Sequence, residues 1–496
     1  MTTRESFERP MLGRGRFSID SDSSDDDLGV YQVDDYDPAN APVAAVAANQ
    51  MEMSQEFNPR QGLLSNISAP AVLMAGGDEE VGLKKNGMKM AFMNMANSII
   101  GAGIIGQPYA LLQCGLITGV VALVTLTFVI DWTIRLMVVN AKLSGTNTYQ
   151  ATVSACFGRA GYLTISLAQG LFAFGGSIAF TVIIGDTIPH VVSAVFPSAA
   201  TIPVIDLLTE RSPVMIICVL FISFPLSLSK NIANLAKASL LALISMLIII
   251  LAVVVEGIRL PSDQHGNFSV PLLTMNKGVF QGMGVISFAF VCHHNSLLIY
   301  GALRKPTLDR FAKVTHWSTG VSMVACMVLA LAGFLTFRDK TEGNVLNNFA
   351  SNNLFINLAR FCFGFNMLTT FPLEIFVCRE VLLDYISSSF QTEVEDESGV
   401  LRPPEPSAFA HNATTAGLTI LTLVVALMTS SLGIVLEVVG STSACMLAYI
   451  LPPLCYLKLA RSNTQSLRQK LAPIACVGFG VVVMIVSTVM TITKAF

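Results

Sequence analysis

Long apolar segments dominate the sequence beyond residue 88. Roughly eleven of them approach the length of about 20 mostly apolar residues that a helix needs to cross a bilayer. The chain of 496 residues is 53% hydrophobic and only 13% charged, whereas soluble domains carry about 25% charged residues. We therefore predict an all-α polytopic membrane protein. The expected spans are 90–113, 116–140, 162–189, 213–229, 236–256, 278–299, 312–337, 354–380, 412–429, 432–457 and 472–492.

The charge of the chain divides it into two parts. Residues 1–86 hold 7 Lys or Arg against 15 Asp or Glu, a net charge of −8, whereas the remainder holds 23 against 18. The first part contains the acidic run SDSSDDD and lacks apolar periodicity, so we expect a disordered acidic tail that cannot bury a core. Residues 87–496 are expected to form the transmembrane domain, with a cytosolic loop at 387–411.

Basic residues gather on alternate loops between the predicted spans. Lys and Arg are enriched in cytosolic loops of membrane proteins, so these loops indicate a cytosolic N-terminus. The residues concerned are Lys84, Lys85, Lys89, Lys142, Arg159, Lys230, Lys237, Arg304, Lys305, Arg310, Lys313, Lys458, Arg461, Arg468 and Lys470.

A glycine-rich stretch interrupts the first apolar segment. NSIIGAGIIGQP, residues 97–108, combines three glycines and a proline with the polar Asn97 and Ser98. Small residues allow close helix packing, but a Gly also costs about 1 kcal/mol relative to Ala in a helix. Unwound backbone at bilayer depth is tolerated only where it lines a cavity or is covered by protein. We therefore expect a non-helical segment around 100–103 that faces a binding cavity.

The sixth apolar segment is the counterpart of the first if the fold is an inverted repeat of five spans plus five. It contains VCHHNSLLIY, residues 291–300, a polar cluster inside an apolar helix, which marks a candidate functional site. No Gly or Pro lies in the cluster, so the break expected here depends on the repeat. His293 and His294 are neighbours that point about 100° apart on a helix, so we expect no metal site.

Three long motifs resemble one transporter family. They are NSIIGAGIIGQPYAL, then FAFVCHHNSLLIY followed by PTLDRFAKVTH, and finally GSTSACMLAYILPPLCYLKL. From about residue 86 to its end, the sequence resembles the amino acid/auxin permease family, in particular the fungal vacuolar amino acid transporters and the animal sodium-coupled neutral amino acid transporters. The resemblance implies eleven spans in a LeuT-like 5+5 inverted repeat with broken helices 1 and 6. It also implies secondary active transport of amino acids coupled to Na⁺ or H⁺.

The resemblance also assigns roles to individual positions. It implies that Asn97, the backbone of Ile100, and the hydroxyls of Thr369 and Thr370 hold a coupling ion. The alternative for each Thr is a hydrogen bond to its own helix. The positions implied to line the substrate pocket are Ser98, Gly101, Ala102, Gly103, His293 and Asn295.

Acidic residues inside apolar segments are the other informative group, because a charge near the membrane centre is costly. Asp131 and Arg135, spaced i and i+4, are predicted to form a structural pair. Asp186 and Glu437 are predicted near the outer ends of their spans, as solvated carboxylates. Glu374 lies in the middle of the eighth span. It is expected either to take part in proton coupling or to pair with a neighbouring helix.

These observations favour a secondary active transporter of neutral amino acids that works by alternating access. Oxygen atoms around Asn97 and Thr370 favour Na⁺, whereas Glu374 and the two histidines favour H⁺, and we favour H⁺. We expect no cofactor beyond the coupling ion and no nucleic-acid partner. Expected partners are the amino acid substrate, membrane lipid and a cytosolic protein that recognises the acidic tail. The expected membrane is that of the vacuole or lysosome, with the endoplasmic reticulum or plasma membrane as alternatives.

A second function is a nutrient receptor that binds an amino acid and signals through the N-terminal tail with little net flux. An enzyme is not expected, because the sequence contains no recognisable nucleophile elbow, metal-binding pair or phosphate-binding loop.

Deletion of the tail tests its predicted independence from transport. Because residues 1–80 lack the apolar periodicity of a folded domain, removing them should leave substrate turnover within about an order of magnitude of the full chain. Uptake by both proteins in proteoliposomes measures this. A truncated protein that reaches its membrane but binds no substrate would contradict the prediction.

Overall fold

The computed structural model describes residues 87–196, 206–228, 239–269, 272–389, 394–395, 401–402, 407–429, 431–460 and 467–495. The predicted tail, residues 1–86, lies outside the described residues, as does much of the loop predicted at 387–411.

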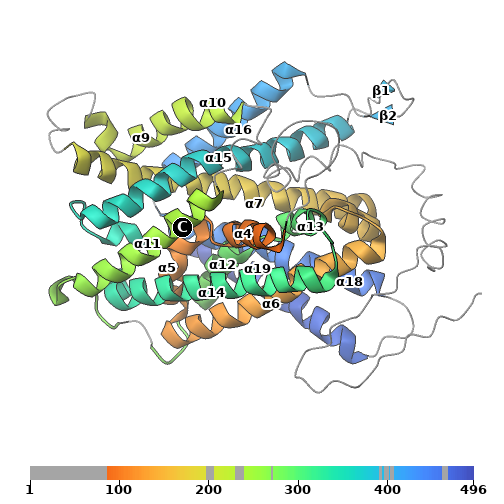
Figure 1. The fold of residues 1–496 in the computed structure, drawn as a ribbon, viewed down its shortest axis with the longest axis horizontal. Coiled ribbons are helices and arrows are strands. Elements are labelled where there is room, and N and C mark those ends of the chain that lie inside the picture. The colour runs from red at the N-terminus through yellow and green to blue at the C-terminus, as the bar shows by residue number, and fades with distance from the viewer. Residues whose placement is uncertain are drawn as a thin grey trace, which may run out of the picture. The chain divides into compact units, whose positions relative to one another are not determined.

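Helices make up nearly all of the described chain (Figure 1). The first half holds α4 (Met88–Ile99), α5 (Gln107–Cys114), α6 (Leu116–Ser144), α7 (Tyr149–Val195), α9 (Arg211–Cys218), α10 (Phe224–Ser227) and α11 (Ser239–Arg259). The second half holds α12 (Val279–Phe290), α13 (His293–Gly301), α14 (Leu308–Phe337), α15 (Leu354–Ser389), α16 (Ala408–Met428), α17 (Leu432–Val439), α18 (Leu451–Leu459) and α19 (Leu467–Ala495). Two short strands, β1 (Val394–Glu395) and β2 (Leu401–Arg402), pair antiparallel with Val394 opposite Arg402.

The lengths of the helices confirm the predicted all-α membrane class. Within the described residues, nine helices are long and apolar enough to cross a membrane. The broken pair α4–α5 stands where the first span was predicted, and the shorter helical segment Arg211–Ser227 stands where the fourth was predicted. The count of eleven crossings stays a prediction.

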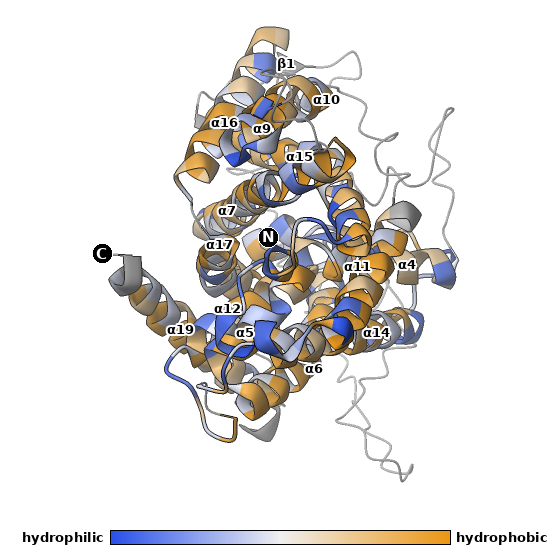
Figure 2. Cartoon of the chain, turned by 90° about the vertical axis from the view of Figure 1, so that its left-hand side faces the viewer, coloured by the Kyte–Doolittle hydropathy of each residue, from blue (hydrophilic) through white to orange (hydrophobic). Residues whose placement is uncertain are grey.

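Large hydrophobic side chains lie exposed on the outer helices. Phe128 on α6 is 68% exposed and Trp317 on α14 is 69% exposed, and Figure 2 shows hydrophobic residues along α6, α14 and α19. Large contiguous apolar surfaces of this kind are rare on soluble monomers. They are the normal condition of helices in contact with lipid, so the exposure agrees with a membrane setting.

Four of the five corresponding pairs of spans in the two predicted repeats pack against each other within the described residues. The first span packs against the sixth through α5 and α12, the second against the seventh through α6 and α14, and the third against the eighth through α7 and α15. The fourth meets the ninth through α10 and α16. The apolar window of the sixth span is 78% buried, whereas that of α19 is 28% buried. The broken sixth span is therefore central and α19 is peripheral.

Two glycines bring the sixth and tenth spans into direct backbone contact. A Cβ atom added to Gly440 would lie 1.8 Å from the carbonyl oxygen of Gly284 on α12. Gly440 begins a π-helical turn, Gly440–Ala444, that follows α17, and a second, Met446–Ile450, precedes α18. The close approach requires glycine at this position, and it fixes the inner wall of the fold next to α12.

We predict that Gly440→Ala destabilises the fold. The added methyl group overlaps the Gly284 carbonyl, and overpacking of this kind costs about 1–3 kcal/mol. The melting temperature of the detergent-purified protein should fall. Gly417→Ala on α16 is the matched control, because a Cβ atom there meets nothing within 4 Å. Equal melting temperatures for the two variants would contradict the packing interpretation.

Candidate functional site

The first span is interrupted at the predicted glycine-rich stretch. Helix α4 ends at Ile99, and Gly101 has φ −70° and ψ −144°, which is not helical. A 3-10 helix then runs over Ala102–Gly106 before α5 begins. The side-chain amide of Gln107 donates to the carbonyl oxygen of Gly103 at 3.0 Å, so it adds a hydrogen bond beside the break. The predicted break of the α-helix is confirmed, but only Ile100 and Gly101 are non-helical, since the rest of the predicted segment 100–103 lies in the 3-10 helix.

The sixth span is also broken, within the polar cluster. Helix α12 ends at Phe290, Val291 is extended at φ −74° and ψ 107°, and α13 begins at His293. The carbonyl oxygen of Cys292 accepts hydrogen bonds from the Asn295 backbone N–H (3.1 Å) and the Ser296 hydroxyl (2.9 Å). Local hydrogen bonds therefore stabilise this break, and they explain why it needs neither Gly nor Pro.

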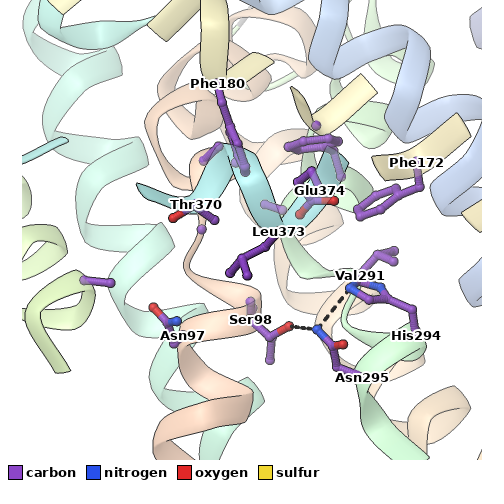
Figure 3. Close-up of a pocket in the computed structure, with 18 of the residues that line it drawn as sticks. Asn97, Ser98, Phe172, Phe180, Val291, His294, Asn295, Thr370, Leu373 and Glu374 are labelled. Carbon is purple, nitrogen blue, oxygen red and sulfur yellow. Dashed lines mark hydrogen bonds between the residues drawn. The ribbon is translucent and has the colours of Figure 1, made fainter. Parts of the chain in front are cut away.

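The two breaks meet at one cavity of ≈ 180 Å³. The Asn295 side-chain amide donates to the Ser98 hydroxyl at 3.0 Å, which joins α13 directly to α4. Figure 3 shows Asn97, Ser98 and Asn295 on one side of this space and Glu374 with Phe172 on the other. The cavity thus has a polar wall at the helix breaks, an apolar wall supplied by α7, and a wall of mixed polar and apolar side chains supplied by α15.

Most of the site residues predicted from the sequence line this cavity. They are Asn97, Ser98, Gly101, Ala102, Gly103, Asn295, Thr369, Thr370 and Glu374. Ile100 and His293 are not among the lining residues. His293 is fully buried, and its Nε2 atom lies 2.9 Å from the Thr133 hydroxyl on α6. His293 therefore links α13 to α6, behind the cavity wall.

The neighbouring His294 faces the cavity in its place. Its ring lies 5.6 Å from the Phe172 ring, and its Nε2 atom accepts from the Asn295 amide at 3.0 Å. The sequence does not indicate which of the two adjacent histidines faces the cavity. Both lie at the start of α13, so their directions depend on the geometry of the break.

Two asparagines of the lining were missed in the sequence. Asn94 lies 6% exposed at the cavity, and no described residue forms a hydrogen bond with its buried Oδ1 atom. Asn366 lines the cavity from α15. The sequence spacing could have predicted both residues. Asn94 is one helical turn before Asn97 and Ser98, and Asn366 is one turn before Thr369 and Thr370. Residues at this spacing lie on one helix face.

The hydroxyls of Thr369 and Thr370 form hydrogen bonds within their own helix. Thr370 donates to the Asn366 carbonyl oxygen at 2.7 Å, and Thr369 donates to the same oxygen at 3.0 Å. The alternative of bonding to the helix is therefore realised in this structure. A hydroxyl that donates in this way still keeps lone pairs for a ligand.

Glu374 differs from the other acids of the spans, because it has no protein partner among the described residues. No hydrogen bond or ion pair to its carboxyl group is formed there, although the group lies at the cavity wall. Of the two alternatives for Glu374, pairing with a neighbouring helix is not realised in the described part of the chain. Its carboxyl group is therefore available to a ligand in the cavity.

The other three acids singled out in the sequence, Asp131, Asp186 and Glu437, have protein partners. Asp131 forms the predicted pair with Arg135 (3.1 Å). The prediction of solvated carboxylates at Asp186 and Glu437 is wrong. Asp186 has a side chain 9% exposed that pairs with Arg211 at 2.9 Å, and Glu437 is 1% exposed.

Partners on two other spans explain the burial of Glu437. Its carboxylate accepts from Tyr109 on α5 (2.9 Å) and from Thr491 on α19 (3.3 Å). Hydrogen bonds to two hydroxyls let this carboxylate lie inside the protein, and they join three spans. Distance from the end of a span was therefore a poor guide to exposure.

Comparison with known proteins places this architecture in a family. The profile of the family described as "Transmembrane amino acid transporter protein" matches residues 84–493. Vacuolar amino acid transporter 2 of Saccharomyces cerevisiae is 43% identical, covering 83% of this chain and 84% of that protein. The putative sodium-coupled neutral amino acid transporter 11 of Danio rerio is 37% identical, covering 81% and 85%.

A solved structure agrees at the level of the fold. The crystal structure of a manganese transporter from Eremococcus coleocola, in complex with an aromatic bis-isothiourea compound, aligns with a TM-score of 0.50 at 11% identity. The alignment covers 88% of this chain and 89% of that one. At this identity the likeness concerns the LeuT-like fold alone.

Gly101 and Gly103 should respond differently to substitution. A Cβ atom at Gly101 meets nothing within 4 Å, whereas one at Gly103 would lie 2.4 Å from the Ala289 Cα atom on α12. Gly101→Val should therefore keep the fold but fill the cavity and abolish amino acid binding. Gly103→Ala should lower the melting temperature, as overpacking does. Calorimetric binding and thermal melting of both variants measure this, and full binding by Gly101→Val would contradict it.

Proposed function

We propose, since the chain belongs to the family of transmembrane amino acid transporter proteins, that it moves neutral amino acids across a membrane by alternating access. The observation that carries the proposal is the cavity between two broken helices, α4–α5 and α12–α13, with polar side chains at the breaks. Breaks of this kind expose backbone N–H and C=O groups to a substrate near the middle of a membrane. The relatives named above are transporters of amino acids by name.

The polar wall suits the part that all amino acids share. A substrate carboxylate would accept from backbone N–H groups at Gly101 to Gly103, where the 3-10 helix begins and its dipole favours negative charge. The substrate ammonium group would donate to carbonyl oxygens freed at the same breaks. Ser98, Asn295 and His294 would complete this end, with His294 taking the position proposed for His293.

We propose that the coupling ion is a proton and that Glu374 carries it. Glu374 and His294 are the two titratable side chains among the residues that line the cavity, and Glu374 has no protein partner in the described chain. Sodium is the alternative, held by Asn97, the backbone of Ile100, Thr369 and Thr370. The names of the animal relatives, sodium-coupled transporters, support that alternative.

The chain is a multi-pass membrane protein, and we propose the vacuolar or lysosomal membrane as its location. The yeast relative is a vacuolar transporter by name. The basic loops support a cytosolic N-terminus. A cytosolic partner for the acidic residues 1–86 is part of the same proposal.

Uptake into proteoliposomes tests the function. The full chain is reconstituted, and radiolabelled glutamine, leucine, lysine and glutamate are offered under an imposed H⁺ gradient, an imposed Na⁺ gradient, or neither. We expect accumulation of the neutral amino acids that increases with the H⁺ gradient. Saturable binding without flux under any gradient would instead indicate the receptor function. Absence of both binding and flux would refute the proposal.

We predict that Glu374→Gln separates exchange from coupling. The substitution keeps the shape of the side chain and removes its titration, so exchange of labelled for unlabelled substrate should continue while acceleration by an imposed pH gradient is lost. Glu210→Gln, which changes an exposed acid ahead of α9, is the matched control and should respond to the gradient as the unmodified protein does. An unchanged response in Glu374→Gln would show that Glu374 carries no coupling proton.

A further inference from the structure

One exposed face of α6 changes from apolar to basic along the helix. Val121, Phe128, Arg135 and Lys142 follow one another at seven-residue spacing, which is about two helical turns, so they lie on one side of the helix. Val121 is 57% exposed, Phe128 is 68% exposed, and Lys142 is exposed as well. The face is therefore apolar over its first half and cationic toward the end of the helix.

Helix α14 shows the same change in the opposite chain direction. Lys313, close to the start of the helix, is exposed, and Trp317 one turn later is 69% exposed. Val321 and Val324 follow on the same side and are 43% and 57% exposed. Tryptophan is enriched where a membrane meets water. This face therefore runs from a cation through an interfacial aromatic ring to apolar side chains.

A buried carboxylate brings the two faces together. Helices α6 and α14 lie side by side (Figure 1). The Oδ2 atom of Asp131 lies 3.1 Å from Nη2 of Arg135 and 3.0 Å from Nδ1 of His316, and Thr319 donates to Oδ1 at 3.2 Å. Asp131 therefore holds Arg135 of α6 beside His316 of α14.

The basic ends of the two helices also meet each other. The Lys142 Nζ atom lies 5.9 Å from the centre of the Tyr300 ring on α13, and that ring packs against Phe311 on α14 at 5.5 Å. The last turn of α6 is thus close to the first turns of α14, so the two helices run antiparallel and their cations lie at the same end. We call this end the basic surface, formed by Arg135, Lys142, Lys313, His316 and Trp317.

Positive charge is in surplus at the basic surface. Segments 131–142 and 304–316 together hold six Lys or Arg and two Asp, a net charge of 6 − 2 = +4 with His neutral. One of the two acids, Asp131, is already paired. The cations are Arg135, Lys142, Arg304, Lys305, Arg310 and Lys313.

The depth of the cations indicates what kind of anion fits. Arg135 is nine residues before the end of α6 at Ser144, and Trp317 is nine residues after the start of α14 at Leu308, which is about 14 Å along each helix axis. At this depth a lipid-exposed cation is costly unless it pairs with an anion. A phospholipid supplies a phosphate for the cations and acyl chains for the apolar half of the same face. A soluble anion or an acidic peptide supplies only the first.

We propose that the basic surface binds the headgroup of an anionic phospholipid, whose acyl chains lie along Phe128, Val321 and Val324. The site faces the leaflet on the side predicted to be cytosolic. No residue of the basic surface lines the cavity, so the inference does not depend on the proposed function. Through Lys142 and Tyr300 the headgroup lies next to α13, which is one half of the broken sixth span.

Tryptophan fluorescence tests the site directly. The chain has two tryptophans, Trp132 and Trp317, so Trp132→Phe leaves Trp317 as the only reporter. The full-length Trp132→Phe protein is reconstituted in phosphatidylcholine vesicles that contain brominated phosphatidylserine or brominated phosphatidylcholine, because bromine quenches a tryptophan that it contacts. Each Lys or Arg favours an anionic lipid several-fold, so we expect phosphatidylserine to be preferred about tenfold at Trp317. High salt should weaken the preference.

Two double substitutions separate a local site from general attraction to the membrane surface. Lys142→Gln with Lys313→Gln removes two exposed cations of the basic surface and should lower the preference several-fold. Arg159→Gln with Lys458→Gln, on α7 and α18, removes two exposed cations predicted on the same side of the membrane and should keep the preference. Lys142→Arg with Lys313→Arg preserves both charges and should also keep it. Melting temperatures in phosphatidylcholine check that each variant is folded.

The outcomes are distinct. A preference for phosphatidylserine that is lost only when Lys142 and Lys313 are neutralised supports the site. Equal quenching by the two brominated lipids overturns the inference and leaves the basic surface to a soluble acidic partner. An equal loss in both neutralised variants also overturns it, because it would show general attraction to the membrane. Amino acid binding enters none of these measurements, so the proposed function stands or falls separately.

Discussion

Every backbone N–H and C=O group at bilayer depth must find a partner inside the protein, because the hydrocarbon core contains no water to supply one. This constraint explains why the two helix breaks occur together at the centre of the fold. The break after Ile99 is covered by α12, and the Gln107 amide donates to the Gly103 carbonyl oxygen in the 3-10 helix that follows it. The break at Val291 is held by bonds to the Cys292 carbonyl. Residues of both breaks line the same cavity, where a ligand can supply hydrogen-bond partners.

Glycine has two opposite effects in this architecture. At Gly103 and Gly440 the absent side chain lets another span approach to backbone contact, and substitution there would force helices apart. At Gly101 the absent side chain leaves open space beside the cavity, and at Gly176 it leaves the Glu374 carboxyl group without a side chain against it from that position. Gly103 joins the first span to the sixth and Gly440 joins the tenth span to the sixth, whereas the second pair keeps polar groups accessible to a substrate. One residue type therefore supports both the rigidity of the scaffold and the accessibility of the site.

Sequence reasoning predicted the features that depend on composition and spacing. Apolar length predicted the spans. The glycines with their polar neighbours predicted a break at residues 100–103, and the structure has it at Ile100 and Gly101, ahead of a 3-10 helix. The sequence did not predict which side chains face the cavity or which are buried, because these depend on the rotation of each helix about its axis and on contacts between distant segments. His293 and His294 are equivalent in the sequence, but only His294 lines the cavity. Glu437 is near the start of its span, and its burial follows from Tyr109 and Thr491, which lie far away in the chain.

We infer that the unwound stretch around Gly101 forms one wall of an amino acid binding site. A structure of the protein in lipid nanodiscs, determined by electron cryomicroscopy with saturating L-glutamine, tests this inference. We expect ligand density between residues 98–103 and Asn295, with the ligand side chain extending toward Glu374. Ligand density elsewhere in the protein, or a continuous helix from Asn97 through Gly103 in the bound state, would contradict it.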